Sequence, residues 1–198
     1  MATKGEGTKK HILRATARLL DKTTDVDALS IRTIARAAGV SPAAINYYFV
    51  SKEKLLIDAV NVAQKKALDN WSALNKTLDV PPEIKLRILC KDMGRFYAEH
   101  RTAALLSLNK DLFLGWDSPS RARFRQTFLV PVLKSINKEK SEKDLLFISG
   151  IMIDTFDLTF LRSVSRQDGA IPDFSNQKER DGFIDRLIDC AMWLYMKD

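Results

Sequence analysis

The sequence predicts an all-α protein of about nine helices, because turn-forming residues are scarce and apolar residues recur with helical spacing. The 198 residues include only 8 Gly and 6 Pro, fewer than β-rich folds need for their turns. Hydrophobic residues make up 45% and charged residues 29% of the chain, which is typical of a folded domain rather than a disordered one. No segment keeps the alternating pattern of a strand.

Three helices are expected in the first quarter of the chain. The first spans about residues 8–22, where apolar residues form one stripe. Ser30 is placed to cap a short second helix, because its hydroxyl can accept a hydrogen bond from an unpaired backbone N–H. Gly39 ends that helix. Ser41 followed by Pro42 then predicts the start of a third helix.

Most later helices are also marked by a capping residue or a helix breaker. The marked starts lie at Ser51, Pro81–Pro82, Ser118–Pro119, Ser141 and Asn176, and a shorter helix is expected over about residues 102–112. Ser141 with Asp144 resembles a capping box, and Pro131 should kink or divide the helix that contains it. The chain is therefore expected to comprise an N-terminal domain of residues 1–50 and a helical domain of residues 51–198.

Several classes of protein are excluded by simple features. The chain has only Cys90 and Cys190, so no disulfide framework exists and a zinc cage would lack ligands. The longest uncharged stretch, Ala37–Ser51, is too short to span a bilayer. No apolar run follows Met1, so no signal peptide is recognised and a cytoplasmic protein is expected. No metal site or cofactor is expected.

The net charge of +7 is concentrated near the N-terminus. Residues 1–66 hold 12 Lys and Arg against 6 Asp and Glu, a balance of +6, whereas residues 67–198 hold 20 against 19. A basic end on a neutral body indicates a module that binds a polyanion. The alternative is a solvated, lysine-rich terminus.

Residues 31–50 have the features of a helix-turn-helix motif. Ala35 is small enough to let the two helices approach closely, and Gly39 tolerates the positive φ that a tight turn needs. The apolar residues that would fasten the helices together are Ile34, Ala38, Val40, Ile45 and Tyr48. An ordinary helical hairpin is the alternative interpretation.

The second helix of this motif would present an uncharged face to a DNA major groove. Small residues allow close approach to base edges, and Asn46 can pair with adenine through two hydrogen bonds. Positive charges flank this face instead of lying on it, which suits contacts to phosphates. These flanking residues are Lys9, Lys10, Arg14, Arg32, Arg36, Lys52 and Lys54.

The run from Ser30 to Leu56 reads SIRTIARAAGVSPAAINYYFVSKEKLL and resembles the DNA-binding domain of the TetR/AcrR family of bacterial transcriptional regulators. The resemblance is dense over about residues 9–56 and rests beyond Ala59 only on helix number and chain length. It implies an all-α homodimer whose N-terminal helices bind operator DNA. It also implies that the C-terminal region binds a small ligand, which spreads the recognition helices and releases the DNA.

The resemblance also implies roles for single residues. Arg32 matches a position that reaches a base edge, Tyr47 an aromatic residue beside the DNA backbone, and Lys52 a lysine that binds phosphate. Asn46 stands where many members carry Tyr, and Tyr48 where many carry His, so Asn46 gains a possible base contact. The candidate DNA-binding residues are Arg32, Ser41, Pro42, Ala43, Ala44, Asn46, Tyr47 and Lys52.

The remainder of the chain could enclose a ligand chamber, although large apolar residues at helical spacing are more often plain core. The candidate ligand-binding residues are Phe96, His100, Leu108, Phe113, Trp116, Phe128, Met152 and Phe156. His100 is also suited to a surface or capping role. Asp154 and Asp157 could meet a cationic or hydroxylated ligand or lie at a solvated edge, and the edge is slightly favoured.

The last two helices have wide apolar faces. One face carries Ile148, Met152, Phe156 and Phe160, and the other carries Phe183, Leu187, Cys190 and Leu194. Two such helices could pack against the same pair in a second copy, or they could pack within one chain. Periodicity does not separate these alternatives, and the family resemblance favours the homodimer.

No catalytic constellation is found, because phosphate loops, nucleophile elbows and metal-ligand spacings are missing from the sequence. The sequence therefore predicts a dimeric transcriptional regulator, a repressor released from operator DNA by an unknown small effector. One alternative is a regulator that works without a small ligand, or an activator that uses a protein partner. The other is a helical interaction protein whose basic end meets a different polyanion.

Overall fold

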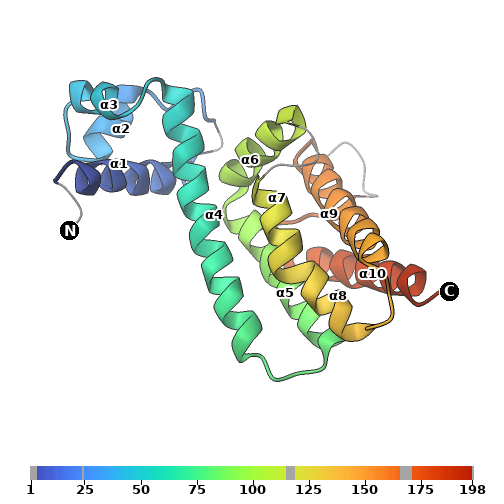
Figure 1. Ribbon diagram of the computed structural model, residues 1–198. Helices are drawn as coiled ribbons and strands as arrows, with labels where there is room; N and C mark the ends of the chain where they lie inside the picture. Colours follow the sequence, from blue (N-terminus) through green and yellow to red (C-terminus); the bar gives the residue numbers. More distant parts are fainter. Residues whose placement is uncertain (1–3, 24, 115–118, 166–170, 198) are drawn as a thin grey trace. The chain divides into compact units, whose positions relative to one another are not determined.

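The computed structural model describes residues 4–23, 25–114, 119–165 and 171–197, and within these ranges it contains helices and turns but no β-strand (Figure 1). The predicted all-α class is confirmed. The helices are α1 (Lys4–Leu20), α2 (Ile31–Ala37), α3 (Pro42–Tyr48), α4 (Lys52–Thr77), α5 (Pro82–Glu99), α6 (Arg101–Leu114), α7 (Pro119–Phe124), the π-helical turn η1 (Arg125–Leu129), α8 (Val130–Ile136), α9 (Glu142–Ser165) and α10 (Gln177–Met196).

The predicted capping residues within the described ranges make the expected hydrogen bonds, whereas Ser118 lies outside the described residues. The hydroxyls of Ser30 and Ser41 each accept one from the backbone N–H three residues later, at 3.1 Å. Ser141 donates to the Asp144 carboxylate at 2.7 Å and accepts from its N–H at 3.2 Å. Asn176 accepts from the backbone at the start of α10. Each cap satisfies a donor that would otherwise be unpaired at the helix start.

The chain divides into two compact units. The N-terminal unit comprises Met1–Ala67 with His100–Lys110, and the C-terminal unit comprises Leu68–Glu99 with Asp111–Asp198. The expected boundary at residue 50 falls inside the N-terminal unit, which includes the first part of α4 and the beginning of α6. The first part of α4 belongs to this unit because its apolar side chains pack in the same core as those of α1–α3.

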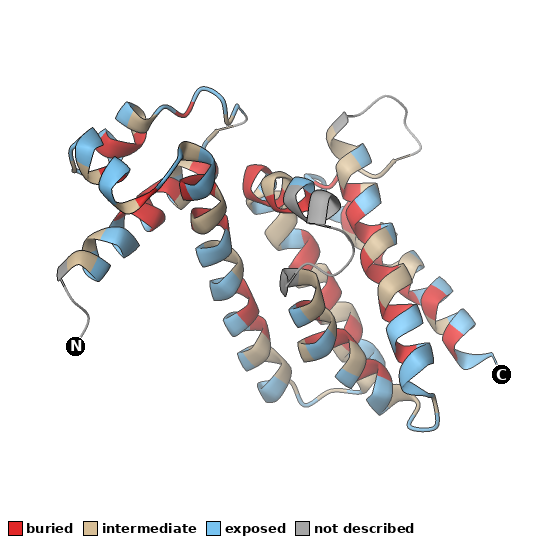
Figure 2. Ribbon diagram, turned by 45° about the horizontal axis from the view of Figure 1, so that its top comes forward, coloured by how far each residue is buried: buried red, intermediate tan, exposed pale blue. Residues whose placement is uncertain are grey.

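The N-terminal unit has its own core, built from the inner faces of α1–α4 (Figure 2). Ile12, Ile34, Ile45 and Leu55 are fully buried there. Thr16 is buried as well, and its hydroxyl donates to the carbonyl of Ile12 at 2.9 Å, which satisfies the polar group inside α1. This core holds the short helices α2 and α3, which are too short to be stable alone.

The C-terminal unit is built around aromatic rings. Tyr97 lies edge-on to Phe156 and Phe160, with ring centroids 5.1 and 5.0 Å apart. Tyr195 is buried, and its hydroxyl donates to the carbonyls of Leu133 at 2.9 Å and Asn137 at 3.1 Å. These two hydrogen bonds of the Tyr195 hydroxyl join the end of α10 to the end of α8.

The apolar stripe of α9 packs within one chain. Ile148, Met152, Phe156 and Phe160 are each at most 4% exposed in the C-terminal unit. For these four residues, the intersubunit interpretation of the sequence pattern is therefore wrong, because the same periodicity serves the intramolecular core. The exposed apolar residues of α9 lie on another face, which includes Phe147 and Leu158.

A π-helical turn precedes Pro131, and α7, η1 and α8 follow one another without a break. The N–H of Val130 donates to the carbonyl of Arg125, five residues earlier. Proline has no N–H and its ring clashes with the carbonyl four residues before it, so a wider turn relieves the conflict. The predicted irregularity at Pro131 is confirmed.

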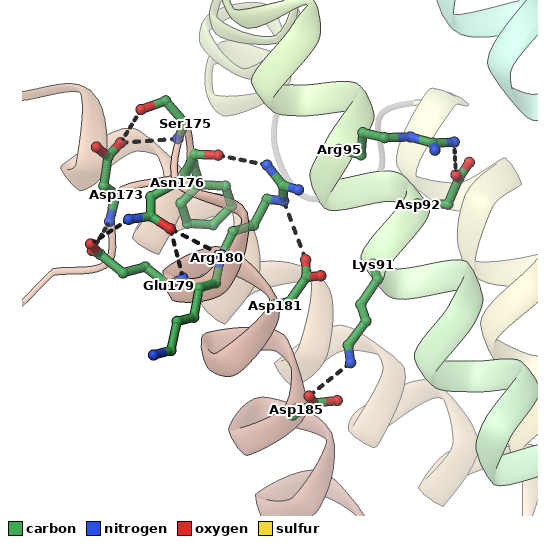
Figure 3. Close-up of polar contacts among 12 residues, drawn as sticks. Lys91, Asp92, Arg95, Asp173, Ser175, Asn176, Glu179, Arg180, Asp181 and Asp185 are labelled. Atoms are coloured by element: carbon green, nitrogen blue, oxygen red, sulfur yellow. Dashed lines mark hydrogen bonds and ion pairs between the residues drawn. The ribbon is translucent and has the colours of Figure 1, made fainter.

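Polar contacts fasten α5 to α10 (Figure 3). Lys91 and Arg87 form ion pairs with Asp185 at 2.8 and 3.1 Å. Gly94 lies where a Cβ would be 2.6 Å from the terminal methyl of Ile184, so a larger residue there would require the Ile184 side chain to shift. Arg180 is buried beside this contact and donates to the carbonyl of Phe174 at 2.9 Å (Figure 3).

Replacement of Asp185 by Asn should reduce stability in a pH-dependent way. Burial raises the pKa of Asp185, but hydrogen bonds and charges from Lys91 and Arg87 outweigh burial and lower the pKa overall. The ion pairs therefore stabilise the fold above the unfolded-state pKa of about 3.9, and this contribution is lost as the pH falls through the folded-state pKa. At about pH 7 we expect a loss below about 1 kcal/mol, because the carboxylate is 37% exposed.

Urea unfolding at about pH 7 and about pH 3 checks this expectation. The Asp185→Asn deficit should be present in full at the higher pH and smaller at the lower one. Asp79→Asn, at an exposed position, is the control and should leave the free energy of unfolding unchanged at both pH values. An equal deficit at both pH values would show that the ion pairs with Lys91 and Arg87 do not cause it.

The two cysteines should differ strongly in reactivity. Cys90 is buried and Cys190 is exposed. Burial raises the pKa of the Cys90 thiol to about 12, although the nearby Arg87 charge acts in the opposite direction. Because the thiolate is the reactive form, Cys90 in a Cys190→Ser variant should resist a thiol reagent in the native state and react fully in urea. Rapid native labelling of that variant would contradict its burial.

Candidate nucleic-acid interface

The turn between α2 and α3 has the geometry that the sequence predicts. Gly39 has φ +60°, which side chains other than glycine rarely adopt. The N–H of Val40 donates to the carbonyl of Ala35 at 3.0 Å, and the N–H of Gly39 donates to that of Arg36 at 3.2 Å. These bonds close the end of α2 and direct the chain into α3.

Apolar packing fixes α3 against α2. Ile34, Ala35, Ala38 and Ile45 are buried at 0–3% exposure in the core of the N-terminal unit. Val40 and Tyr48 are partly buried against the same cluster. The predicted set of fastening residues is thus confirmed, and the two helices form a helix-turn-helix.

A contact from α1 also supports the turn. The Nε2 atom of His11 lies 3.1 Å from the carbonyl of Ala38, at the end of α2. Lys9 lies over the ring of Phe49, with its Nζ 5.6 Å from the ring centroid. Sequence reasoning missed both contacts, because each joins residues far apart in the chain and neither spacing is a motif.

The side of α3 opposite the core is exposed and uncharged. Ser41, Pro42, Ala43, Asn46 and Tyr47 are exposed, and Ala44 is half-buried. Tyr47 is 82% exposed and lies edge-on to Tyr48, with ring centroids 5.0 Å apart. The Ser41 hydroxyl caps α3 by accepting the Ala44 N–H. These candidate DNA-binding residues of α3 and its cap therefore share one accessible surface.

Basic residues lie on the helices before and after α3 in the same unit. Arg32 and Arg36 are exposed on α2, and Lys9, Lys10 and Arg14 are exposed on α1. Lys52 is half-buried at the start of α4, where its Nζ donates to the carbonyl of Asp27 at 3.2 Å. This bond holds the ammonium group near the loop before α2. An uncharged face bordered by cations can approach a groove and contact the phosphates on both sides.

The candidate ligand-binding residues are not brought together in one unit. Phe96, Phe128, Met152 and Phe156 belong to the C-terminal unit, whereas His100 and Leu108 belong to the N-terminal unit. His100 pairs through Nδ1 with Asp21 at 2.7 Å. Trp116 and the side chain of Phe113 lie outside the described residues.

The aromatic residues of this set pack with one another and with Trp71. Phe96 and Phe128 lie edge-on to Trp71, with ring centroids 5.6 and 6.2 Å away. Met152 and Phe156 line an apolar void of about 10 Å³. Side chains therefore almost completely fill this part of the C-terminal unit.

Asp157 does not lie at a solvated edge, so that expectation is wrong. It is 4% exposed, pairs with Arg121 and accepts a hydrogen bond from the Tyr97 hydroxyl at 3.2 Å. Asp154, one turn earlier, lies 3.3 Å from the same guanidinium group. The sequence contained the carboxylates and the arginine, but nothing in the pattern aligned α7 with α9.

Neither a metal-binding cluster nor a membrane-spanning helix is found in the described part of the chain. Its His, Cys, Asp and Glu side chains form no group of three or more that could hold a metal ion. None of its helices combines the length and the apolar character needed to cross a membrane.

Comparisons with known proteins agree with the helix-turn-helix. Residues 12–59 match the model of the family described as bacterial regulatory proteins, tetR family. A search of curated proteins gives no match.

Solved structures of regulators are similar over nearly the whole chain. A tetR-family transcriptional regulator from Streptomyces coelicolor has 18% identity and a TM-score of 0.67, covering 98% of this chain and 85% of that one. A TetR-like regulator from a Rhodococcus species has 15% identity and a TM-score of 0.64, covering 98% and 99%. The FadR repressor of Thermus thermophilus, solved with lauroyl-CoA, has 22% identity and a TM-score of 0.60, covering 93% and 94%.

The matched segment contains the turn at Gly39, all of α3 and the start of α4, and the similar structures share the helical architecture beyond it. Residues 12–59 thus match the DNA-binding domain of the tetR family of bacterial regulatory proteins, and the chain shares the all-helical fold of the solved TetR-family regulators.

Proposed function

We propose that the protein is a homodimeric repressor that binds a specific operator and leaves it when a small effector binds. The observation that carries the proposal is the exposed, uncharged face of α3 bordered by exposed cations. Non-specific polyanion binding needs only positive charge. A neutral face of small residues, with Asn46 and Tyr47 beside them, is suited to reading base edges.

The division of roles follows from the positions of the side chains. Asn46 is exposed on α3, and its amide can donate to and accept from one adenine at once. Lys52 stands outside α3, at the start of the next helix, where an ammonium group meets phosphate without regard to sequence. Arg32 is exposed on α2 and can reach a base edge or the backbone beside it.

A second copy is the proposed occupant of the exposed apolar surface on α9 and α10. Phe147 is 64% exposed and Leu158 50% exposed on α9, and Trp193 is 60% exposed and Leu194 44% exposed on α10. Isolated exposed apolar residues are ordinary, whereas large aromatic ones gathered on two adjoining helices are typical of an interface. Within the C-terminal unit α9 packs on α10, so the residues can form one continuous surface.

Two alanine variants should separate base contacts from phosphate contacts. With an operator selected from random duplexes, Asn46→Ala should cost about 1–3 kcal/mol at one base pair and relax the preference there. Lys52→Ala should weaken all duplexes nearly equally and reduce the slope of log affinity against log salt by about one. Fluorescence anisotropy over a series of duplexes and salt concentrations gives both quantities.

Lys76→Ala, an exposed lysine at the end of α4, is the matched control and should leave affinity and slope unchanged. If Asn46→Ala weakens every duplex alike, Asn46 contacts a phosphate. Equal wild-type affinity for all duplexes would overturn the operator-specific function itself.

A regulator without a small effector is the second candidate. The void of about 10 Å³ among Met152, Phe156 and their neighbours favours it, because a ligand pocket is normally far larger. A thermal-shift screen with apolar, aromatic and cationic compounds discriminates, since binding to the native state raises the unfolding temperature. Consistent failure of all compounds would favour this second function.

A further inference from the structure

A separate cavity lies between the segment containing η1 and helix α9, within the C-terminal unit. Its volume is about 170 Å³, and its walls are formed by Arg121, Arg125, Gly150, Ile153 and Asp154. A cavity of about 150 Å³ is large enough for a benzene ring. The space therefore admits a small organic molecule, unlike the nearly filled apolar void beside it.

Arg125 is the unusual member of this wall. Its Nε is buried and has no hydrogen-bond partner among the described residues. The same holds for the Nε atom of Arg121, but Arg121 is paired with Asp154 and Asp157 through Nη2. Burial of a guanidinium donor without an acceptor is unfavourable, so such groups call for a partner. Arg125 is also the first residue of the π-helical turn, a distortion that recurs at functional sites.

The second guanidinium is already occupied. Arg121 forms an ion pair with the buried Asp157 and another with Asp154 at 3.3 Å. An entering anion would thus find its contact at Arg125, while Arg121, together with Arg125, offsets the charge of Asp154. Because the carboxylates of Asp154 and Asp157 lie close to the cavity, a ligand with one negative charge is acceptable, whereas a doubly charged phosphate is disfavoured.

Gly150 opens the opposite wall. It lies in the middle of α9, where glycine is less favourable than alanine. A Cβ at this position would meet nothing within 4 Å, so close helix packing does not explain the glycine. The absent side chain instead leaves room for a ligand to approach the helix backbone beside Ile153.

We propose that this cavity binds a small organic monocarboxylate, with its carboxylate on Arg125 and its apolar body between Gly150 and Ile153. A planar guanidinium can hold a carboxylate through two parallel hydrogen bonds. As an assignment of the effector class, this inference rests on the proposed function. Binding itself does not depend on it.

Benzoate is the probe, because its ring matches the cavity volume and its single charge matches Arg125. Titration calorimetry and thermal unfolding of the full chain should detect benzoate, whereas benzyl alcohol and inorganic phosphate should bind at least tenfold more weakly. Arg125→Gln should weaken benzoate at least tenfold. Arg123→Gln is the matched control, because Arg123 is 52% exposed and pairs with Asp69 at 3.7 Å, and it should bind as the wild type.

A second variant keeps the test independent of charge. Gly150→Leu should fill the cavity and abolish benzoate binding while the chain stays folded, since its first side-chain atom meets open space. Gly182→Leu, at another helical glycine with open space, is the control outside the cavity. Benzoate affinity that is unchanged in Arg125→Gln or Gly150→Leu, or phosphate binding as strong as benzoate binding, would overturn the proposal.

Operator release is measured separately by anisotropy. If benzoate binds through Arg125 but does not release operator DNA, the binding site is supported and its role in releasing the operator is contradicted. If another compound releases the operator DNA equally well from the wild type, Arg125→Gln and Gly150→Leu, the repressor function is upheld. That result would overturn this cavity as the effector site.

Discussion

Replacement of Asp157 by Leu is expected to lower the free energy of unfolding by about 3 kcal/mol. Asp157 is 4% exposed and pairs with Arg121, whose side chain is 11% exposed. The single replacement leaves a buried guanidinium without its main partner, and it also removes the acceptor of the Tyr97 hydroxyl. The loss stays at the low end of the usual range because Asp154 remains 3.3 Å from Arg121.

Urea unfolding of three variants checks this expectation. Asp157→Leu and Arg121→Met should each be destabilised, whereas the double variant should recover most of the loss, because a buried ion pair is often replaced by apolar residues at little cost. Losses that simply add in the double variant would show that the two residues do not act as a pair. The same cycle measures how strongly α7 is held to α9.

Replacement of Phe147 by Glu is expected to separate the proposed dimer and to weaken operator binding by about a hundredfold or more. Phe147 is 64% exposed, so the fold of one chain should not need it. In a dimer, however, the charge would be buried beside apolar residues of the second copy, which is costly. Two recognition helices on one operator bind far more tightly than one helix alone, so dissociation removes this advantage.

Light scattering after size-exclusion chromatography gives the mass, and anisotropy gives the affinity. Val62→Glu is the matched control, because Val62 is 39% exposed and lies on α4 in the N-terminal unit, not on α9 or α10. It should leave both mass and affinity unchanged. A Phe147→Glu variant that stays dimeric and binds DNA normally would place the interface elsewhere.

The sequence predicted features that depend on neighbouring residues. Ser30 and Ser41 cap helices because a hydroxyl beside a helix start can reach the backbone wherever that helix lies. Gly39 adopts a positive φ for reasons confined to its own backbone. The helix-turn-helix and the exposed face of α3 follow from such local rules, together with the apolar stripe that fixes which side is buried.

Only the tertiary structure decided features that join distant segments. The apolar pattern of α9 did not say whether Phe156 would meet its own chain or a second copy, because periodicity identifies a buried face but not its partner. Likewise, the register between the η1 segment and α9 pairs Asp157 with Arg121 and places Arg125 at the wall of a cavity. The π-helical turn before Pro131 shifts this register. The sequence by itself therefore determined the helices and the exposed face of α3, whereas long-range packing decided the ion pair and the cavity.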